Sequence, residues 1–243
     1  MKSVLILGAT SDVGKALAHE YAGNGYELYL GGRNTEDISP ICNDLKIKHE
    51  VSATAYTFDA MKVETHDQLI SSLPSFPDVV ICVFGYLGDQ EKAQENWDVA
   101  NQIIETNYTG AASILERFAK SMEQNKSGSI VGISSVAGER GRQSNYFYGS
   151  AKAGFTAYLS GLRNRLFHSN VNVLTVKPGF IDTKMTEGMD LPKPLTASPQ
   201  QVAKAIYKAE RKGKATIYVL GMWRLIMYII KSIPEFIFKR LKL

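Results

Sequence analysis

The stretch SVLILGATSDVGKAL, residues 3–17, joins a short apolar run to a glycine turn and then to the start of a helical pattern. Gly8 permits a tight turn out of the strand, and Gly14 lets the start of the helix pack closely on it. The exposed N–H groups and the positive end of the helix dipole would together bind a pyrophosphate. A glycine-rich turn is a weak signal alone, but this one lies between a strand and a helix, the context that a dinucleotide site requires.

The rest of the chain repeats this alternation. Several strand-like runs are apolar on successive residues, which is typical of strands buried on both faces. The pattern predicts an α/β fold, a doubly wound parallel sheet of seven strands with helices on both faces, in one domain over residues 1–220. The predicted strands are 3–8, 27–32, 53–58, 78–85, 128–135, 170–179 and 215–221, and the predicted helices are 12–24, 36–48, 62–73, 97–125, 147–168 and 199–212.

Composition and charge exclude some classes of protein. The 243 residues are 44% hydrophobic and 21% charged, as in an ordinary globular chain. Residues 221–243 hold five basic residues and one acidic residue, so the net charge of +4 lies entirely in this tail. A nucleic-acid-binding protein would be expected to spread basic residues over its folded surface, so we expect no nucleic-acid partner.

The cysteines and histidines show no pattern of a disulfide or a metal site. Cys42 and Cys82 have no pairing pattern and the chain opens without a secretory signal, so we expect a cytoplasmic protein. We expect no metal, because the histidines lack metal-ligand spacing, and each is expected at the surface or at a helix end. They are His19, His49, His66 and His168.

The end of the second predicted strand bears on the choice of dinucleotide. An NAD site usually has a carboxylate about 20 residues after the glycine turn, which accepts a hydrogen bond from the ribose 2′-hydroxyl. Here the sequence is LGGRN, residues 30–34, and Arg33 could instead bind a 2′-phosphate through two parallel hydrogen bonds. Arg33 could also be an ordinary exposed arginine. We favour NADP(H) as the cofactor.

A second informative stretch is NYFYGSAKAGF, residues 145–155. Lys152 follows Tyr148 by four residues and Tyr146 by six, so on a helix it shares a face with Tyr148 only. A cation beside the Tyr148 phenol would lower its pKa from about 10 and favour the ionised form. The spacing therefore identifies Tyr148, rather than Tyr146, as the candidate acid or base.

Six motifs in this order resemble the short-chain dehydrogenase/reductase family across nearly all of residues 1–219. The resemblance implies a Rossmann-like fold, NADP(H) as cofactor, a small-molecule carbonyl or alcohol substrate and a homo-oligomer, either a dimer or a tetramer. The motifs are GATSDVG (8–14), FDA (58–60), TNYTG (106–110), SIVGISSVAG (129–138), YGSAK (148–152) and PGFIDT (178–183).

The resemblance also implies roles for single residues. Tyr148 would protonate the carbonyl oxygen, Ser135 would stabilise that oxygen as charge develops, and Lys152 would lower the Tyr148 pKa and hold the nicotinamide ribose. Asn107 would anchor a water that carries protons from Lys152 to solvent. Taken alone, Ser135 could be a strand-end cap and Asn107 a helix kink. Tyr146 would line the substrate cleft or pack near it. The implied cofactor contacts are Gly8, Thr10, Ser11, Asp12, Val13, Gly14, Arg33, Asp59 (adenine), Gly85, Lys152, Pro178, Gly179, Ile181 and Thr183.

The sequence departs from the family pattern at three places. Asp12 replaces the usual middle glycine of the turn, and we expect this aspartate to cap the following helix. Leu7 stands where the family usually has threonine. CVFG, residues 82–85, replaces the usual Asn-Asn-Ala-Gly, and Phe84 cannot supply the hydrogen bonds of an asparagine.

The tail, residues 221–243, lies outside the resemblance. Its apolar runs are too short to span a membrane, but mixed aromatic and basic residues suit a segment lying on an anionic membrane surface. A helix packed on the core or on a second subunit is the equal alternative. Membrane contact through 222–243 would favour a hydrophobic or lipid-linked substrate and a peripheral location on the inner face of the membrane. A non-catalytic NADP(H) sensor, or a membrane-recruited regulatory protein on the same fold, is the alternative function.

Overall fold

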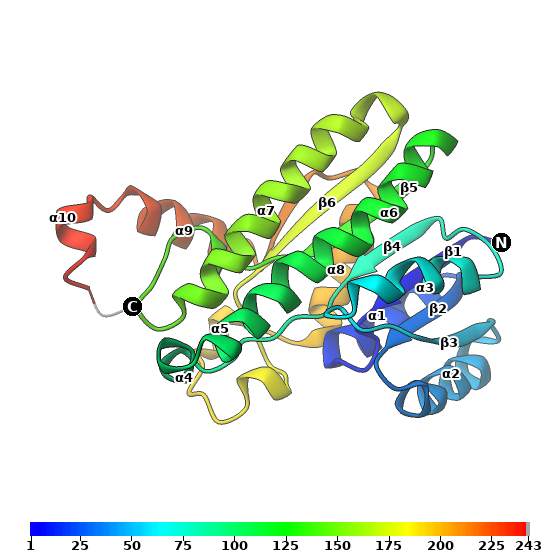
Figure 1. Ribbon diagram of the computed structural model, residues 1–243, viewed down its shortest axis with the longest axis horizontal. Coiled ribbons are helices and arrows are strands. Elements are labelled where there is room, and N and C mark those ends of the chain that lie inside the picture. The colour runs from blue at the N-terminus through cyan, green and yellow to red at the C-terminus, as the bar shows by residue number, and fades with distance from the viewer. Residues whose placement is uncertain (242–243) are drawn as a thin grey trace.

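A computed structural model of the chain describes residues 1–241. Over these residues seven parallel strands form one sheet in the order β3-β2-β1-β4-β5-β6-β9 (Figure 1). The predicted doubly wound sheet is therefore confirmed. The order reverses between β1 and β4, and in such sheets the ligand site lies at the carboxyl ends beside this reversal. The strands are β1 (Ser3–Leu7), β2 (Glu27–Gly32), β3 (Ala53–Thr57), β4 (Val79–Cys82), β5 (Gly128–Ile133), β6 (Val171–Pro178) and β9 (Thr216–Val219).

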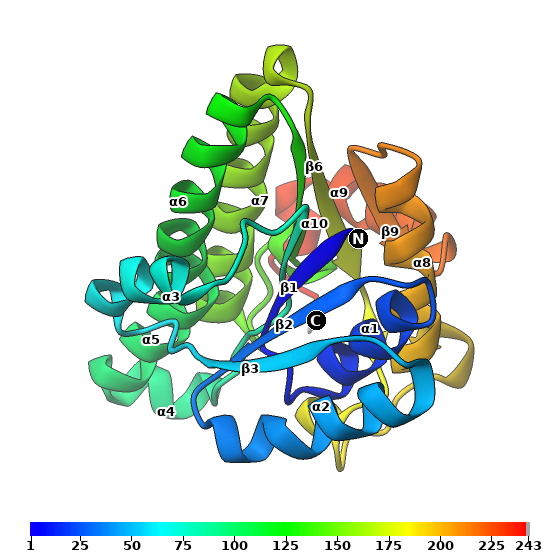
Figure 2. The same cartoon turned by 90° about the vertical axis from the view of Figure 1, so that its right-hand side faces the viewer.

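Helices cover both faces of this sheet (Figure 2). One face carries α1 (Asp12–Ala22), α2 (Thr35–His49) and α8 (Pro199–Arg211), and the other carries α3 (His66–Ser72), α6 (Gly110–Asn125) and α7 (Tyr146–Leu166). The continuous apolar run of β1 follows from this layering. Val4 and Ile6 pack into one core cluster, while Leu5 and Leu7 pack into the other, because successive side chains of a strand point to opposite faces.

The predicted helical stretch 97–125 is helical over its whole length. It consists of α5 (Trp97–Ile104), a π-helical segment (Glu105–Thr109) and α6, and the sequence did not predict the π-helical turn. Asn107 lies in the π-helical segment, where its amide nitrogen donates to the Ile103 carbonyl. Inserted π-helical turns often lie at functional sites.

Short elements that the sequence did not predict surround the carboxyl ends of the strands. They are α4 (Gln90–Glu95) and the paired strands β7 (Phe180–Ile181) and β8 (Thr196–Ala197). Six-residue helices and two-residue strands are too short to leave a periodic pattern in the sequence.

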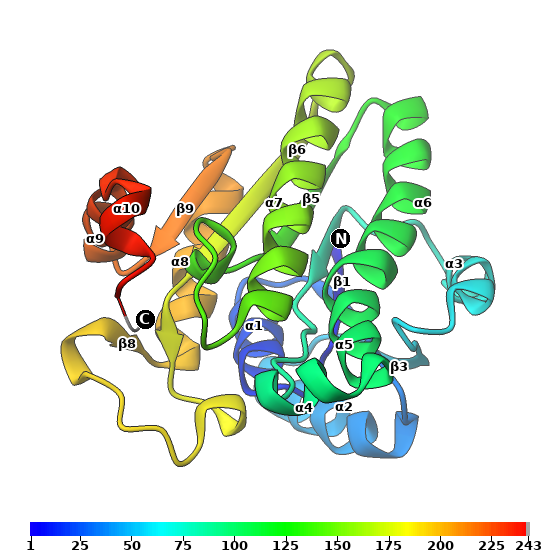
Figure 3. The same cartoon turned by 60° about the vertical axis from the view of Figure 1, so that its left-hand side comes forward.

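The tail forms two helices, α9 (Met222–Ser232) and α10 (Glu235–Phe238), which lie beside β9 (Figure 3). Trp223 and Met227 of α9 are buried against Val136, so this face of the tail packs on the core. Gly179 makes the close approach possible, because a Cβ at that position would lie 1.8 Å from the Trp223 ring. The packing of the tail on the core, which was the alternative to membrane contact, is therefore present.

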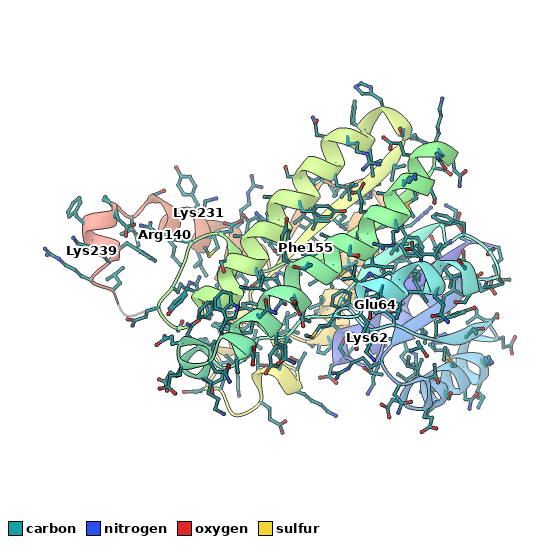
Figure 4. All side chains as sticks on the ribbon, in the orientation of Figure 1. Lys62, Glu64, Arg140, Phe155, Lys231 and Lys239 are labelled. Carbon is teal, nitrogen blue, oxygen red and sulfur yellow. The ribbon has the colours of Figure 1, made fainter. Side chains whose placement is uncertain are left out.

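One arginine of the core holds the end of α9. Arg140 lies beside Lys231 in Figure 4, and its Nη1 donates to the carbonyl oxygens of Ile230 (2.6 Å), Lys231 (3.2 Å) and Ile233 (2.6 Å). Its Nη2 also pairs with the Glu235 carboxylate at 3.0 Å. Because the last carbonyl oxygens of a helix have no N–H donor within it, this cation satisfies groups that would otherwise need water.

The opposite face of the tail is open to solvent. Its exposed apolar side chains are Leu225, Tyr228, Ile229, Phe236 and Ile237. Within the described residues, no helix combines the length and the apolar character that a membrane span requires.

Candidate active site

The glycine turn after β1 has the geometry of a phosphate site. The Ser11 hydroxyl, rather than the Asp12 carboxylate, caps α1 by accepting from the Gly14 N–H at 3.0 Å. The expectation that Asp12 is the cap is wrong. Its carboxylate instead accepts from the Lys184 N–H at 3.0 Å, which joins the loop after β7 to the turn. The first N–H groups of α1, including that of Val13, have no acceptor within the helix and remain available for an anion.

A side chain at either of the two predicted glycines of the turn would clash with the backbone. Gly8 has φ +97°, and a Cβ there would lie 2.7 Å from the backbone nitrogen of Phe84. At Gly14 a Cβ would lie 2.3 Å from the Gly8 carbonyl oxygen. The Phe84 ring lies 5.3 Å from that of Phe58 and packs into the core. The departure at residues 82–85 therefore replaces hydrogen-bonding groups with a packed aromatic ring beside the turn.

The end of β2 lies against the same turn. The N–H groups of Gly8 and Ala9 donate to the Gly31 carbonyl oxygen at 2.9 and 3.1 Å. Arg33 follows two residues later and is exposed, and Asn34 after it caps α2 through its side-chain oxygen. Arg33 thus follows directly on the strand that contacts the glycine turn, and no acidic side chain occupies residues 27–34 after Glu27.

The backbone of Asp59 is contacted by a histidine. His66 is the first residue of α3, one of the two expected positions, and it is completely buried. Its Nε2 lies 3.0 Å from the Asp59 carbonyl oxygen and its Nδ1 lies 3.1 Å from the Ser113 hydroxyl. Burial lowers the pKa of His66, which favours the neutral ring. The Asp59 side chain itself accepts from the Met61 N–H at 3.1 Å.

Lys152 is a buried cation at the centre of the site. Its Nζ donates to the Ile133 carbonyl oxygen at 3.0 Å, and burial lowers the pKa of Lys152 to about 8. Gly85 leaves room for it, since a Cβ there would lie 3.3 Å from Nζ and 3.0 Å from the side-chain oxygen of Asn107. Gly85, three residues after β4, therefore spares both side chains a tight contact.

Asn107 ties the π-helical segment to the chain after β4. Its side-chain oxygen accepts from the Tyr86 N–H at 3.2 Å, and its amide nitrogen donates to the Tyr86 carbonyl oxygen at 2.6 Å. It is also buried. Asn107 therefore has a structural role in the π-helical segment, in line with the alternative considered for it from the sequence.

Tyr148 lies in the cavity, whereas Tyr146 does not line it and is 41% exposed. Burial raises the pKa of Tyr148 to about 12, and a hydrogen bond with Ser135 opposes that rise. The expectation that Lys152 lowers this pKa is not met, because burial dominates and the Lys152 Nζ lies 5.7 Å from the centre of the ring. The phenol is therefore protonated at neutral pH. The Ser135 hydroxyl also accepts from the Ala137 N–H at 3.1 Å, so the strand-end cap predicted as its alternative role is present as well.

A cavity of about 300 Å³ brings most of the predicted residues together. Gly8, Gly14, Arg33, Asp59 and Asn107 lie outside its lining. The predicted residues that line it are Thr10, Ser11, Asp12, Val13, Gly85, Ser135, Tyr148, Lys152, Pro178, Gly179, Ile181 and Thr183.

Part of the cavity wall consists of residues that were not predicted from the sequence. Trp223 reaches it from the tail, and its Nε1 donates to the Leu195 carbonyl oxygen at 3.0 Å. No local pattern marks Trp223, because its contact with Gly179 joins residues 44 positions apart. The further missed lining residues are Val83, Phe84, Leu87, Ile133, Ser134, Val136, Ala137, Arg142, Asn145, Phe180, Lys184, Met185, Thr186 and Met189.

Comparisons with known proteins agree with this geometry. Residues 2–193 match the family described as short chain dehydrogenase. An uncharacterised oxidoreductase of Mycobacterium tuberculosis is 34% identical over 241 residues, covering 98% of this chain and 96% of the relative. A solved short-chain dehydrogenase from Sphingobium yanoikuyae in complex with NADPH has a TM-score of 0.83 at 20% identity, covering 97% of each chain. An actinorhodin polyketide ketoreductase with NADPH has a TM-score of 0.80 at 21% identity, covering 90% of this chain and 97% of its own. The chain belongs to the short-chain dehydrogenase/reductase family of oxidoreductases.

Proposed function

We propose that the protein is an NADP(H)-dependent reductase that interconverts a hydrophobic carbonyl compound and its secondary alcohol. The observation that carries this proposal is the presence of Ser135, Tyr148 and Lys152 in the same cavity as the glycine-turn residues. When bound, the nicotinamide supplies or accepts the hydride. The protein's own groups then have to supply and accept one proton at the carbonyl oxygen.

Tyr148 is the proton donor of this proposal. A phenol with a pKa of about 12 is protonated at neutral pH and can donate to an oxygen that becomes negative during reduction. Ser135 offers its hydroxyl to the same oxygen. Lys152, with a pKa of about 8, exchanges protons readily near neutral pH and can replace the one that Tyr148 gives up. Asn107 retains a second lone pair on its side-chain oxygen, which could hold the proposed water.

Three observations support NADP(H) over NAD(H). Arg33 follows directly on β2, no carboxylate follows Gly31 at the end of that strand, and two solved structures with the same fold contain NADPH. We also propose that Asp59 contacts the adenine of the cofactor. The support for this contact is that His66 holds the Asp59 backbone through its carbonyl oxygen.

The substrate side of the cavity supports a hydrophobic substrate. Leu87, Phe180, Met185, Met189 and Trp223 all line it. The homo-oligomer implied by the family stays a prediction, which sedimentation equilibrium tests directly.

We expect the full chain to oxidise NADPH with some member of a panel of hydrophobic ketones and aldehydes. Tyr148→Phe should lower that rate by about 10²–10⁴-fold, the usual contribution of a general acid, while NADPH still binds. Tyr146→Phe is the matched control and should keep most of the activity. Equal losses from both changes would contradict the assignment of Tyr148. NADPH binding without turnover on the whole panel would favour the non-catalytic sensor.

NADPH should bind more tightly than NADH by about 1.5–3 kcal/mol, the value of one charge-assisted hydrogen bond to phosphate. Arg33→Ala should remove most of this difference, whereas Lys46→Ala, an exposed cation on α2, should leave it intact. Fluorescence titrations of both cofactors measure the preference. A preference that survives in Arg33→Ala would mean that another residue recognises the 2′-phosphate.

We also propose that the outward face of the tail contacts anionic membrane. Leu225, Tyr228 and Ile229 are exposed beside the basic Arg224 and Lys231, and each basic residue near such a surface contributes about 1 kcal/mol. Co-sedimentation with phosphatidylserine vesicles should exceed that with neutral vesicles and should weaken as salt rises.

A double variant tests this contact without removing the inward face of the tail. Leu225→Glu with Ile229→Glu should abolish vesicle binding, and so should a chain ending at Leu220. Ile47→Glu, on an exposed apolar residue of α2, is the control. Binding that ignores lipid charge and the double variant would leave the tail as a packing element only.

A further inference from the structure

Arg142 is a cation in the active-site cavity without a matching anion. It lies in the loop between Ser135 and Tyr148 and lines the cavity with both of them. Its Nη2 lies 3.5 Å from the Met227 sulfur, a weak acceptor, and its Nε is buried without a hydrogen-bond partner. Among residues 1–241, no carboxylate forms an ion pair with it.

The arginine two positions earlier provides a contrast within the same loop. Arg140 is engaged by three carbonyl oxygens and the Glu235 carboxylate, so its charge is used to hold the tail. Burial lowers the pKa of Arg142, which shows that the protein surroundings disfavour its charge. A guanidinium nevertheless stays protonated, so this charge is present in the cavity and lacks a counterion from the protein.

The surroundings of Arg142 leave room for an anion. Asn145 also lines the cavity, and its side-chain oxygen is buried without a partner. The assignment of oxygen and nitrogen in an asparagine amide is exchangeable, so Asn145 can present its NH₂ to an anion instead. Asp12 is the acidic residue in the described lining, and its carboxylate is engaged by the Lys184 N–H. Arg142 and Asn145 belong to one turn, in which the Asn145 N–H donates to the Arg142 carbonyl oxygen at 3.2 Å. Each of their side chains has one buried polar atom without a hydrogen-bond partner, Nε of Arg142 and the side-chain oxygen of Asn145.

We propose that Arg142, with Asn145, binds an anionic group of the substrate, a carboxylate or a phosphate, while the apolar wall around Trp223 holds its hydrophobic part. This inference rests on the proposed reductase function and narrows its substrate to an amphipathic carbonyl compound with a negative charge. A guanidinium binds carboxylate and phosphate through two parallel hydrogen bonds, and in a cavity with little water such a contact is strong. Because Asn145 lies three residues before Tyr148, the anion would also fix the distance between the substrate and the phenol.

Binding of small amphiphiles tests this without any need for turnover. The chain has two tryptophans, Trp97 and Trp223, so the Trp97→Phe variant makes the cavity residue Trp223 the sole tryptophan reporter. Octyl phosphate, octanoate and 1-octanol, which share one chain length, are titrated below their aggregation limits. The titrations are made in saturating NADP⁺, so that the phosphate site of the cofactor is filled.

At least one anion should bind about tenfold or more tightly than 1-octanol, as expected for a charge-assisted contact. Tighter binding of octyl phosphate would identify a phosphate, and tighter binding of octanoate a carboxylate. Arg142→Gln should remove the preference, Arg142→Lys should keep part of it, and Arg224→Gln should keep all of it, because Arg224 is an exposed cation outside this cavity. Thermal unfolding of each variant checks that it is folded.

Equal affinities of the three amphiphiles for the parent chain would overturn the proposal. An anion preference that survives in folded Arg142→Gln would overturn it as well. If Arg142→Gln does not fold, a reduced preference in folded Arg142→Lys supports the guanidinium as the anion ligand, and its full retention contradicts it. Failure of NADPH oxidation would contradict the reductase function instead, and this binding measurement would distinguish the two.

Discussion

The site is organised around one buried cation, the ammonium of Lys152. A buried charge is costly unless polar groups surround it, and here the Ile133 carbonyl oxygen is its hydrogen-bond acceptor among the described residues. The end of β5 supplies that carbonyl, the end of β4 supplies the space at Gly85, and the π-helical segment supplies Asn107. The same burial lowers the pKa of Lys152 to about 8, which brings its proton exchange close to neutral pH.

The loop that contains residues 139–142 and the tail hold each other in place. Residues 139–142 provide a charge contact to α9 and α10 at Arg140, and Glu139 accepts from Tyr218 and pairs with Lys177 and Lys231. Glu139 and Arg140 lie between Ser135 and Tyr148 in the chain, so the tail packs on the same loop that joins these two cavity residues. Trp223 of the tail also forms part of the cavity wall.

The parts of this structure that local patterns control could be predicted from the sequence. The β1 run, the two glycines of the turn and the four-residue spacing of Tyr148 and Lys152 each follow from backbone geometry within a few residues. The parts that depend on distant contacts could not. Trp223 reaches the cavity only because Gly179 lacks a side chain, and Asp12 accepts from Lys184 instead of capping its helix. The Tyr148 pKa was mispredicted because burial, which the spacing does not reveal, outweighs the nearby cation.

The most direct test of this account is an NMR titration of the full chain with lysine labelled at ¹³Cε, with the Lys152 signal assigned through its loss in Lys152→Met. Below its pKa Lys152 is charged, and above it the side chain is neutral. We expect Lys152 to titrate near pH 8. A Lys152 signal that titrates at the ordinary lysine value of 10.5 would contradict the buried ammonium on which the proposed proton transfer depends.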